Sequence, residues 1–281
     1  MRIIEKISDI KAVIKEYKKF CKTVGFVPTM GYLHEGHLSL VRASKSQNDI
    51  TIMSIFVNPT QFGPSEDFSK YPRDMERDSR LAEESGVDII FAPTVEEMYP
   101  DGYKTYVNVE TITEVLCGKS RPGHFKGVTT VVNKLFNIIE PDRAYFGQKD
   151  AQQVIVIKKM VRDLNMNLEI VTCPIVREQD GLAMSSRNVY LSPEERKAAL
   201  ILSQSLQEAQ NLILKGEKSR AKVIEIIKSR ISCEKLAKID YVQMLDAKDL
   251  KDIELIGGSI LIALAVKFGS TRLIDNVMME V

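Results

Sequence analysis

The sequence has few of the residues that build metal centres and disulfide frameworks. Only four cysteines and three histidines occur among its 281 residues, and no two cysteines form a Cys-x-x-Cys pair. Scattered thiols of this kind are typical of reduced, cytoplasmic proteins, and they form no familiar zinc-binding spacing with the histidines. We therefore expect a cytoplasmic protein without a structural zinc site.

The sequence also lacks an excess of charge and a long apolar run. Its 39 basic and 38 acidic residues leave a net charge of +1, which gives no sign of a basic surface for nucleic acid. Residues 1–20 alternate charged and apolar residues at helical spacing, unlike a signal peptide, and the apolar run 259–269 is too short to cross a bilayer. We expect small-molecule partners rather than nucleic acid or a membrane.

Segments of strand and helix character alternate through the first part of the chain. Residues 23–28, 49–59 and 87–93 are predicted strands, and the segments between them have the patterns of helices. This order predicts parallel strands joined by crossover helices. From Ser192 onward the pattern changes to two long amphipathic helices and two or three strands.

We therefore predict an α/β fold with two domains. Residues 1–175 would form a doubly wound, Rossmann-like parallel sheet that binds nucleotide. Residues 176–281 would form a smaller α+β domain that carries the Met-Ser-Ser-Arg loop.

Two of the three histidines, His34 and His37, lie in the segment VPTMGYLHEGHLSL, with Gly36 between them. In a doubly wound sheet, ligands bind at the carboxyl ends of strands, where helix N-termini present amide groups to anions. Glycine allows close approach of a phosphate, and the imidazoles could donate hydrogen bonds to it. No GxGxxG or GxxxxGK[ST] motif is present, so a different kind of phosphate site is indicated. A simple helix-capping role explains this segment equally well when it is taken alone.

A second polar cluster, Ser185, Ser186 and Arg187, lies in the segment VREQDGLAMSSRNVYLS. Its hydroxyls, backbone N–H groups and guanidinium are suited to holding triphosphate oxygens. A polar surface loop would have the same composition. The two segments together are more specific than either one, and they resemble the HIGH and KMSKS motifs of the nucleotidyl-transferring α/β superfamily, which activates carboxylates with ATP.

Over essentially its whole length the sequence resembles the pantothenate synthetase (pantoate–β-alanine ligase) family. The resemblance is carried by the blocks PTMGYLHEGHLSLV, SIFVNPTQFGPSEDFSKYPRD, GHFKGVTTVVNKLFNIIEPDRAYFGQKDAQQ and VREQDGLAMSSRNVYLS. It implies ATP-dependent condensation of (R)-pantoate with β-alanine through pantoyl adenylate, with release of pyrophosphate and then AMP. It also implies a homodimer, and ATP as a substrate with Mg²⁺ that is held mostly by phosphate oxygens and water.

The resemblance also implies site residues. Those expected to stabilise charge on the phosphates are His34, His37, Lys149 and Arg187. Those expected to bind pantoate or β-alanine are Asn58, Gln61 and Gln153. The ATP site would comprise Met30, Gly31, Tyr32, Leu33, His34, Glu35, Gly36, His37, Gly147, Gln148, Lys149, Asp150, Val176, Met184, Ser185, Ser186 and Arg187.

The chemistry favours hydrogen-bond donation by His37 over proton transfer, because the pantoate carboxylate is already ionised near neutral pH. The second step does need a proton acceptor for the β-alanine amine, and the sequence identifies none. It also assigns no role to Arg121 or His124. Asp74 and Asp78 are expected on a solvated helix face.

Two other functions remain compatible with these motifs. One is a nucleotidyltransferase of the same superfamily, although residues 58–71 offer amides and aromatics rather than extra cations for a second phosphate. The other is a non-catalytic nucleotide sensor, since a fold does not determine a function. An aminoacyl-tRNA synthetase is disfavoured by the length and by the balanced charge.

Overall fold

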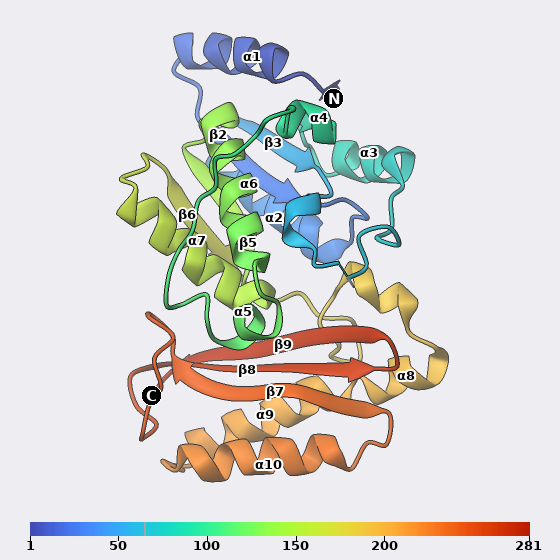
Figure 1. The fold of residues 1–281 in the computed structure, drawn as a ribbon, viewed down its shortest axis with the longest axis vertical. Helices are drawn as coiled ribbons and strands as arrows, with labels where there is room; N and C mark the ends of the chain where they lie inside the picture. Colours follow the sequence, from blue (N-terminus) through green and yellow to red (C-terminus); the bar gives the residue numbers. More distant parts are fainter. Residues whose placement is uncertain (65) are drawn as a thin grey trace. The chain divides into compact units, whose positions relative to one another are not determined.

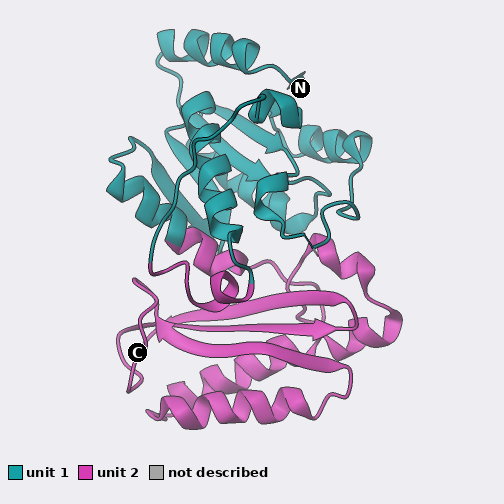
Figure 2. Cartoon of the chain, in the orientation of Figure 1, with its two compact units in different colours: residues 1–110, 121–148, 156–174 teal, residues 111–120, 149–155, 175–281 magenta. Residues whose placement is uncertain are grey.

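A computed structural model describes residues 1–64 and 66–281, which form two compact units (Figure 2). The first unit contains residues 1–110, 121–148 and 156–174, and the second contains residues 111–120, 149–155 and 175–281. The main change of unit therefore falls at residue 175. Two short segments that come earlier in the chain, 111–120 and 149–155, also belong to the second unit. The division into two domains, residues 1–175 and 176–281, that was inferred from the sequence stays a prediction.

The first unit is built on a six-stranded parallel sheet with the order β1-β4-β3-β2-β5-β6. Figure 1 labels four of these strands, β2, β3, β5 and β6. The strands are β1 (Arg2–Ile4), β2 (Val24–Thr29), β3 (Ile50–Ile55), β4 (Ile89–Phe91), β5 (Arg143–Gly147) and β6 (Glu169–Cys173). All five pairings are parallel. The predicted doubly wound α/β fold is confirmed.

Helices connect these strands. They are α1 (Ile7–Lys19), α2 (Glu35–Gln47), α3 (Met75–Glu84), the single turn α4 (Val95–Met98), α6 (His124–Ile139) and α7 (Ala151–Asp163), with 3₁₀ turns η1 (Pro59–Gln61) and η2 (Gln148–Asp150). Successive side chains of a strand point to opposite faces of the sheet. Accordingly, Val27 packs in one core cluster with Leu40 and Val41 of α2, whereas Phe26 contacts Phe136 of α6 edge-to-face.

The N-terminus differs from its sequence-based prediction. Helical spacing was expected throughout residues 1–20, but Arg2–Ile4 form the edge strand β1, which pairs with β4, and the helix begins only at Ile7. Three residues are too few to show the alternation of a strand. Pairing with the neighbouring strand decides their conformation.

The second unit combines a three-stranded antiparallel sheet with helices. Its strands are β7 (Ala237–Asp246), β8 (Ser259–Phe268) and β9 (Thr271–Glu280), and its helices are α5 (Leu116–Ser120), α8 (Pro193–Ala198), α9 (Ile201–Leu214) and α10 (Arg220–Ser232), with the 3₁₀ turn η3 (Ser186–Tyr190). Alternate residues of β8, from Ile260 to Phe268, pack in one core with α9 and α10. No helix among residues 1–64 and 66–281 is long and apolar enough to span a membrane.

Candidate active site

Three segments predicted to bind ligands follow neighbouring strands of the parallel sheet. β2 lies between β3 and β5. The turn Met30–His34 follows β2, Asn58 and Gln61 follow β3, and Gly147–Gln148 end β5 and begin η2. Because the strands are parallel, their carboxyl ends meet at one edge, where open α/β sheets bind ligands. The first unit thus brings these three predicted segments together.

The two histidines are held by the start of α2. His34 is the N-cap, and its Nδ1 accepts the backbone N–H of Gly36 at 3.1 Å. Nδ1 of His37 lies 3.4 Å from the backbone N–H of His34, and the two rings stack with centroids 4.0 Å apart. A ring nitrogen that accepts a hydrogen bond carries no proton. The ring proton of each histidine is therefore on Nε2, which makes Nε2 a hydrogen-bond donor.

The turn before the histidines has an unusual backbone. Gly31 has φ +84° and Tyr32 has φ +50°, and only glycine adopts such conformations without strain. The side chain of Leu33 is fully buried in the core. Any contact that Leu33 makes with ATP would therefore come from its backbone.

Asp78 stabilises this turn, which corrects the expectation that it lies on a solvated helix face. Its carboxylate is buried and accepts the backbone N–H groups of Tyr32 at 2.6 Å and Leu33 at 2.7 Å. Arg77 donates to the carbonyl of Leu33 at 2.9 Å, and its guanidinium lies over the Tyr32 ring. Burial raises the pKa of the Asp78 carboxyl, and the two backbone donors oppose that shift. By contrast, Asp74 is the exposed N-cap of α3.

Asn58 and Gln61 belong to one hydrogen-bonded group. Asn58 is buried, and its Nδ2 donates to Oε1 of Gln61 and to the carbonyl of Gly127, both at 3.2 Å. Its Oδ1 accepts the hydroxyl of Tyr99 at 2.8 Å. Nε2 of Gln61 lies 3.1 Å from Sδ of Met30, which links the segment after β3 to the segment after β2.

Arg121 and His124, to which the sequence assigned no role, hold the backbone of Gln61. Nδ1 of His124 lies 2.9 Å from the Gln61 carbonyl oxygen, and Arg121 donates to the same oxygen at 3.4 Å. Arg121 also makes two hydrogen bonds with Glu66, at 2.6 and 2.7 Å. The presence of an arginine and a histidine in one glycine-rich segment was the only sequence signal for this network.

The predicted residues from Lys149 onward lie in the second unit. Lys149 is partly buried in η2, and Asp150 is exposed. Val176 and Met184 face each other in a short hairpin through a 3.0 Å backbone hydrogen bond. Ser185 then caps η3 by accepting the N–H of Arg187 at 3.3 Å, and Ser186 is buried. Lys149 and Ser185 line the same small cavity.

Of two adjacent glutamines in α7, the buried one has a structural role. Gln152 donates to the carbonyls of Ile112 and Val115 and accepts the N–H of Cys117, so it anchors the segment before α5. Gln153, the one predicted to bind pantoate, is only partly buried.

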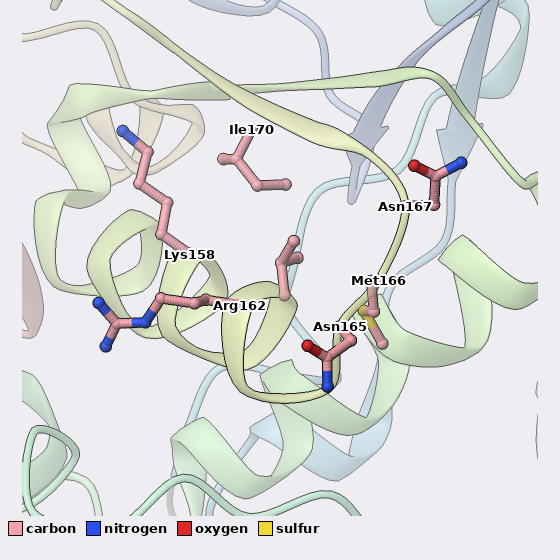
Figure 3. Close-up of a pocket in the computed structure, with 7 residues that line it drawn as sticks. Lys158, Arg162, Asn165, Met166, Asn167 and Ile170 are labelled. Carbon is pink, nitrogen blue, oxygen red and sulfur yellow. The ribbon is translucent and has the colours of Figure 1, made fainter.

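A larger hollow of about 520 Å³ lies elsewhere, beside the end of α7 (Figure 3). It is lined by Lys158, Val161, Arg162, Asn165, Met166, Asn167 and Ile170, and no predicted site residue is among them. Among the described residues, no group of three or more histidine, cysteine, aspartate and glutamate side chains is arranged to hold a metal ion.

Comparisons with known proteins identify the family of the chain. The family described as "Pantoate-beta-alanine ligase" matches residues 2–278. Pantothenate synthetase of Acetivibrio thermocellus is 71% identical over 281 residues, which cover 100% of both chains. Pantothenate synthetase of Caldicellulosiruptor saccharolyticus is 62% identical over 281 residues, again covering 100% of both chains.

Solved structures show the same similarity. The crystal structure of pantothenate synthetase from Thermus thermophilus has a TM-score of 0.94 at 45% identity, covering 99% of each chain. Pantoate–β-alanine ligase from Francisella tularensis, complexed with "Beta-gamma ATP" and β-alanine, has a TM-score of 0.81 at 37% identity, covering 99% of this chain and 97% of that one. Family match, relatives and fold lead to one conclusion: the chain belongs to the pantoate–β-alanine ligase family.

Proposed function

We propose that one site, formed by His34, His37, Lys149 and the segment 184–187, binds ATP and catalyses the family reaction. That reaction is the ATP-dependent condensation of pantoate with β-alanine through pantoyl adenylate, and the chain is a ligase of this kind. The observation that carries the site assignment is the meeting of three predicted segments at the carboxyl ends of β3, β2 and β5.

In the first step, a pantoate carboxylate oxygen attacks the α-phosphorus of ATP, the bond from that phosphorus to the bridging oxygen breaks, and pyrophosphate leaves. Negative charge increases on the departing phosphates, and donors that already point at them stabilise the transition state without reorganising. The Nε2–H groups of His34 and His37, with Lys149 and Arg187, supply such donors. The carboxylate is already ionised, so this step needs no base.

In the second step, the neutral amine of β-alanine attacks the acyl carbon, the bond from that carbon to the AMP oxygen breaks, and AMP leaves. The proton lost from the amine nitrogen passes to water or to a phosphate oxygen. Asn58, Gln61 and Gln153 bind the acid substrates, since each amide offers donors and an acceptor. The short link from Gln61 to Met30 supports a pantoate position beside the ATP turn.

Mg²⁺ enters as part of the ATP substrate in this proposal. The buried carboxylate beside the histidine turn, Asp78, is already engaged by two backbone N–H groups and by Arg77. Phosphate oxygens and water would therefore supply most of the ligands of the ion, as Mg²⁺ prefers in nucleotide sites.

We further propose a cytoplasmic homodimer. All four cysteines are free thiols, which suits a reducing compartment. Sedimentation equilibrium should give twice the mass of one chain. A mass equal to one chain at micromolar concentration would contradict the dimer.

The proposal is tested by following pyrophosphate and AMP separately. With ATP, Mg²⁺ and pantoate, pyrophosphate should appear, and AMP should follow only when β-alanine is added. Pyrophosphate that forms without pantoate but with a phosphorylated acceptor would indicate a nucleotidyltransferase. Tight binding of ATP without turnover would indicate a sensor. The site assignment is tested by Lys149→Ala and Arg187→Ala, each of which should slow pyrophosphate release.

A further inference from the structure

Strand β9 carries two adjacent buried polar residues, Asp275 and Asn276, which have no part in the reaction described above. Their exposed fractions are 2% and 3%. Burying a carboxylate is costly unless it is paired and hydrogen-bonded. The partners of these two side chains therefore show what they stabilise.

Asp275 holds Arg177 through a pair of hydrogen bonds. Nη1 of Arg177 donates to Oδ2 at 2.7 Å, and Nη2 donates to Oδ1 at 2.9 Å. The backbone N–H of Asn276 also donates to Oδ1, at 2.8 Å. Two parallel bonds fix the orientation of a guanidinium more strictly than one bond does.

Arg177 lies in the hairpin that leads to the Ser185–Arg187 segment. It pairs with Ala183 across the hairpin, and its Nη1 also donates to the carbonyl of Gly181, in the turn, at 3.1 Å. Ser185 comes two residues after Ala183. The pair between Asp275 and Arg177 therefore fixes the base of the segment predicted to hold the triphosphate.

Asn276 holds the other cationic segment. Its Nδ2 donates to the backbone carbonyl oxygen of Lys149 at 2.9 Å. Because Asp275 and Asn276 are adjacent in β9, the two segments are attached to neighbouring residues of the same strand. Lys149, Ser185 and Asp275 also line one cavity of about 10 Å³, which is room for about one water molecule.

We propose that Asp275 and Asn276 are positioning residues for adenylation, which set the distance between Lys149 and the Ser185–Arg187 segment so that both contact the phosphates of one ATP. The inference rests on the proposed roles of Lys149 and Arg187. A misplacement of about 1 Å in a catalytic group can reduce the rate by up to a hundredfold.

The test is a double-mutant cycle with Asn276→Ala and Lys149→Ala, with pantoate-dependent pyrophosphate release as the readout. Asn276→Ala should lower kcat for adenylation by about tenfold or more in the wild-type chain. In the Lys149→Ala background the same change should alter kcat by less than about twofold, because the positioned group is gone. An equal loss in both backgrounds, or no loss in either, overturns the role of Asn276.

Asp275 is tested through Arg177→Lys, which keeps the positive charge but loses the paired geometry. Arg177→Lys should slow adenylation when it is introduced into the wild-type chain. It should have little further effect when it is introduced into the Arg187→Ala variant. A matched control is Asp240→Asn. Asp240 forms another ion pair in the same sheet, with Arg272 at 2.8 Å, and the substitution removes its charged carboxylate. The control should stay within about twofold of wild type, and thermal melting should show that every variant is folded.

The cycles also separate this inference from the proposed function. If Lys149→Ala or Arg187→Ala alone adenylates at the wild-type rate, the assignment of that residue to the ATP site fails. If those variants are slow but Asn276→Ala and Arg177→Lys are not, only the positioning inference fails.

Discussion

His34 and His37 each direct Nδ1 toward a backbone N–H of their own turn, so the ring proton lies on Nε2. Capping and donation to a ligand are therefore compatible roles of the same imidazole. The sequence presented them as alternatives, whereas the geometry allows both, because a ring has two nitrogens that act separately.

The first prediction concerns His37. Removing the imidazole by His37→Ala should lower the rate of pyrophosphate release by one to three powers of ten, as expected for the loss of one preorganised donor. His37→Gln should recover part of the rate, since its amide N–H reaches a similar position. A rate for His37→Ala close to that of the wild type would remove this residue from the mechanism.

The second prediction concerns Glu66. Burial raises the pKa of its carboxyl, but the hydrogen bonds and charge of Arg121 outweigh that effect, so the pKa lies below its usual range. A carboxyl with a depressed pKa in the folded state stabilises the protein above its unfolded pKa, and that contribution is lost as the pH falls through the folded pKa.

Accordingly, Glu66→Gln should lower the free energy of unfolding at pH 7 by about 1 kcal/mol, because solvent screens this partly buried ion pair and reduces the value expected for a hydrogen bond between charged groups. The difference between variant and wild type should shrink as the pH falls below about 4. Chemical denaturation of both proteins at a series of pH values measures this difference in the free energy of unfolding. A difference that stays constant down to pH 3 would show that the ionisation of Glu66 does not contribute.

At the scale of elements, the close contact between α6 and η1 positions the predicted pantoate-binding residues. Gly127 of α6 has no space for a side chain: a Cβ there would lie 2.5 Å from the carbonyl carbon of Thr60 and 2.6 Å from Cα of Gln61. Its own carbonyl accepts a hydrogen bond from Asn58. Glycine thus lets the helix approach the turn that carries Gln61.

The third prediction is that Gly127→Ala displaces η1. It should raise KM for pantoate more than KM for ATP, and it should destabilise the fold by about 1–3 kcal/mol, as overpacking does. Steady-state kinetics with each substrate varied and thermal unfolding measure the two effects. Gly257→Ala, where a Cβ would meet no atom within 4 Å, is the matched control. Equal changes in both KM values would contradict a local effect on the pantoate side.

The sequence predicted the parallel sheet well because buried strands have continuous apolar runs and helices have their own period. It failed for Asp78, whose charge suggested solvent exposure. The spacing of Asp78 and Ala82, both buried on α3, places them on one helix face and was a usable signal. The sequence could not reveal the pairing of Arg177 with Asp275 or that of Asn276 with Lys149. The partners are 98 and 127 residues apart, and such distant pairs leave no local pattern in the sequence.

At the scale of the whole molecule, the proposed catalytic and substrate-binding residues are distributed over the two compact units. His34, His37 and Gln61 belong to the first, and Lys149, Gln153 and Arg187 belong to the second. The proposed function therefore requires that residues of both units contact ATP and the acid substrates.

The most direct measurement of the central claim is a crystal structure of the protein with pantoate, Mg²⁺ and a non-hydrolysable ATP analogue. The proposal predicts one nucleotide whose phosphates lie within hydrogen-bond distance of Nε2 of His34 or His37 and also of Lys149 or Arg187, with pantoate against Gln61. A nucleotide contacted by only one of these two groups of residues would contradict it.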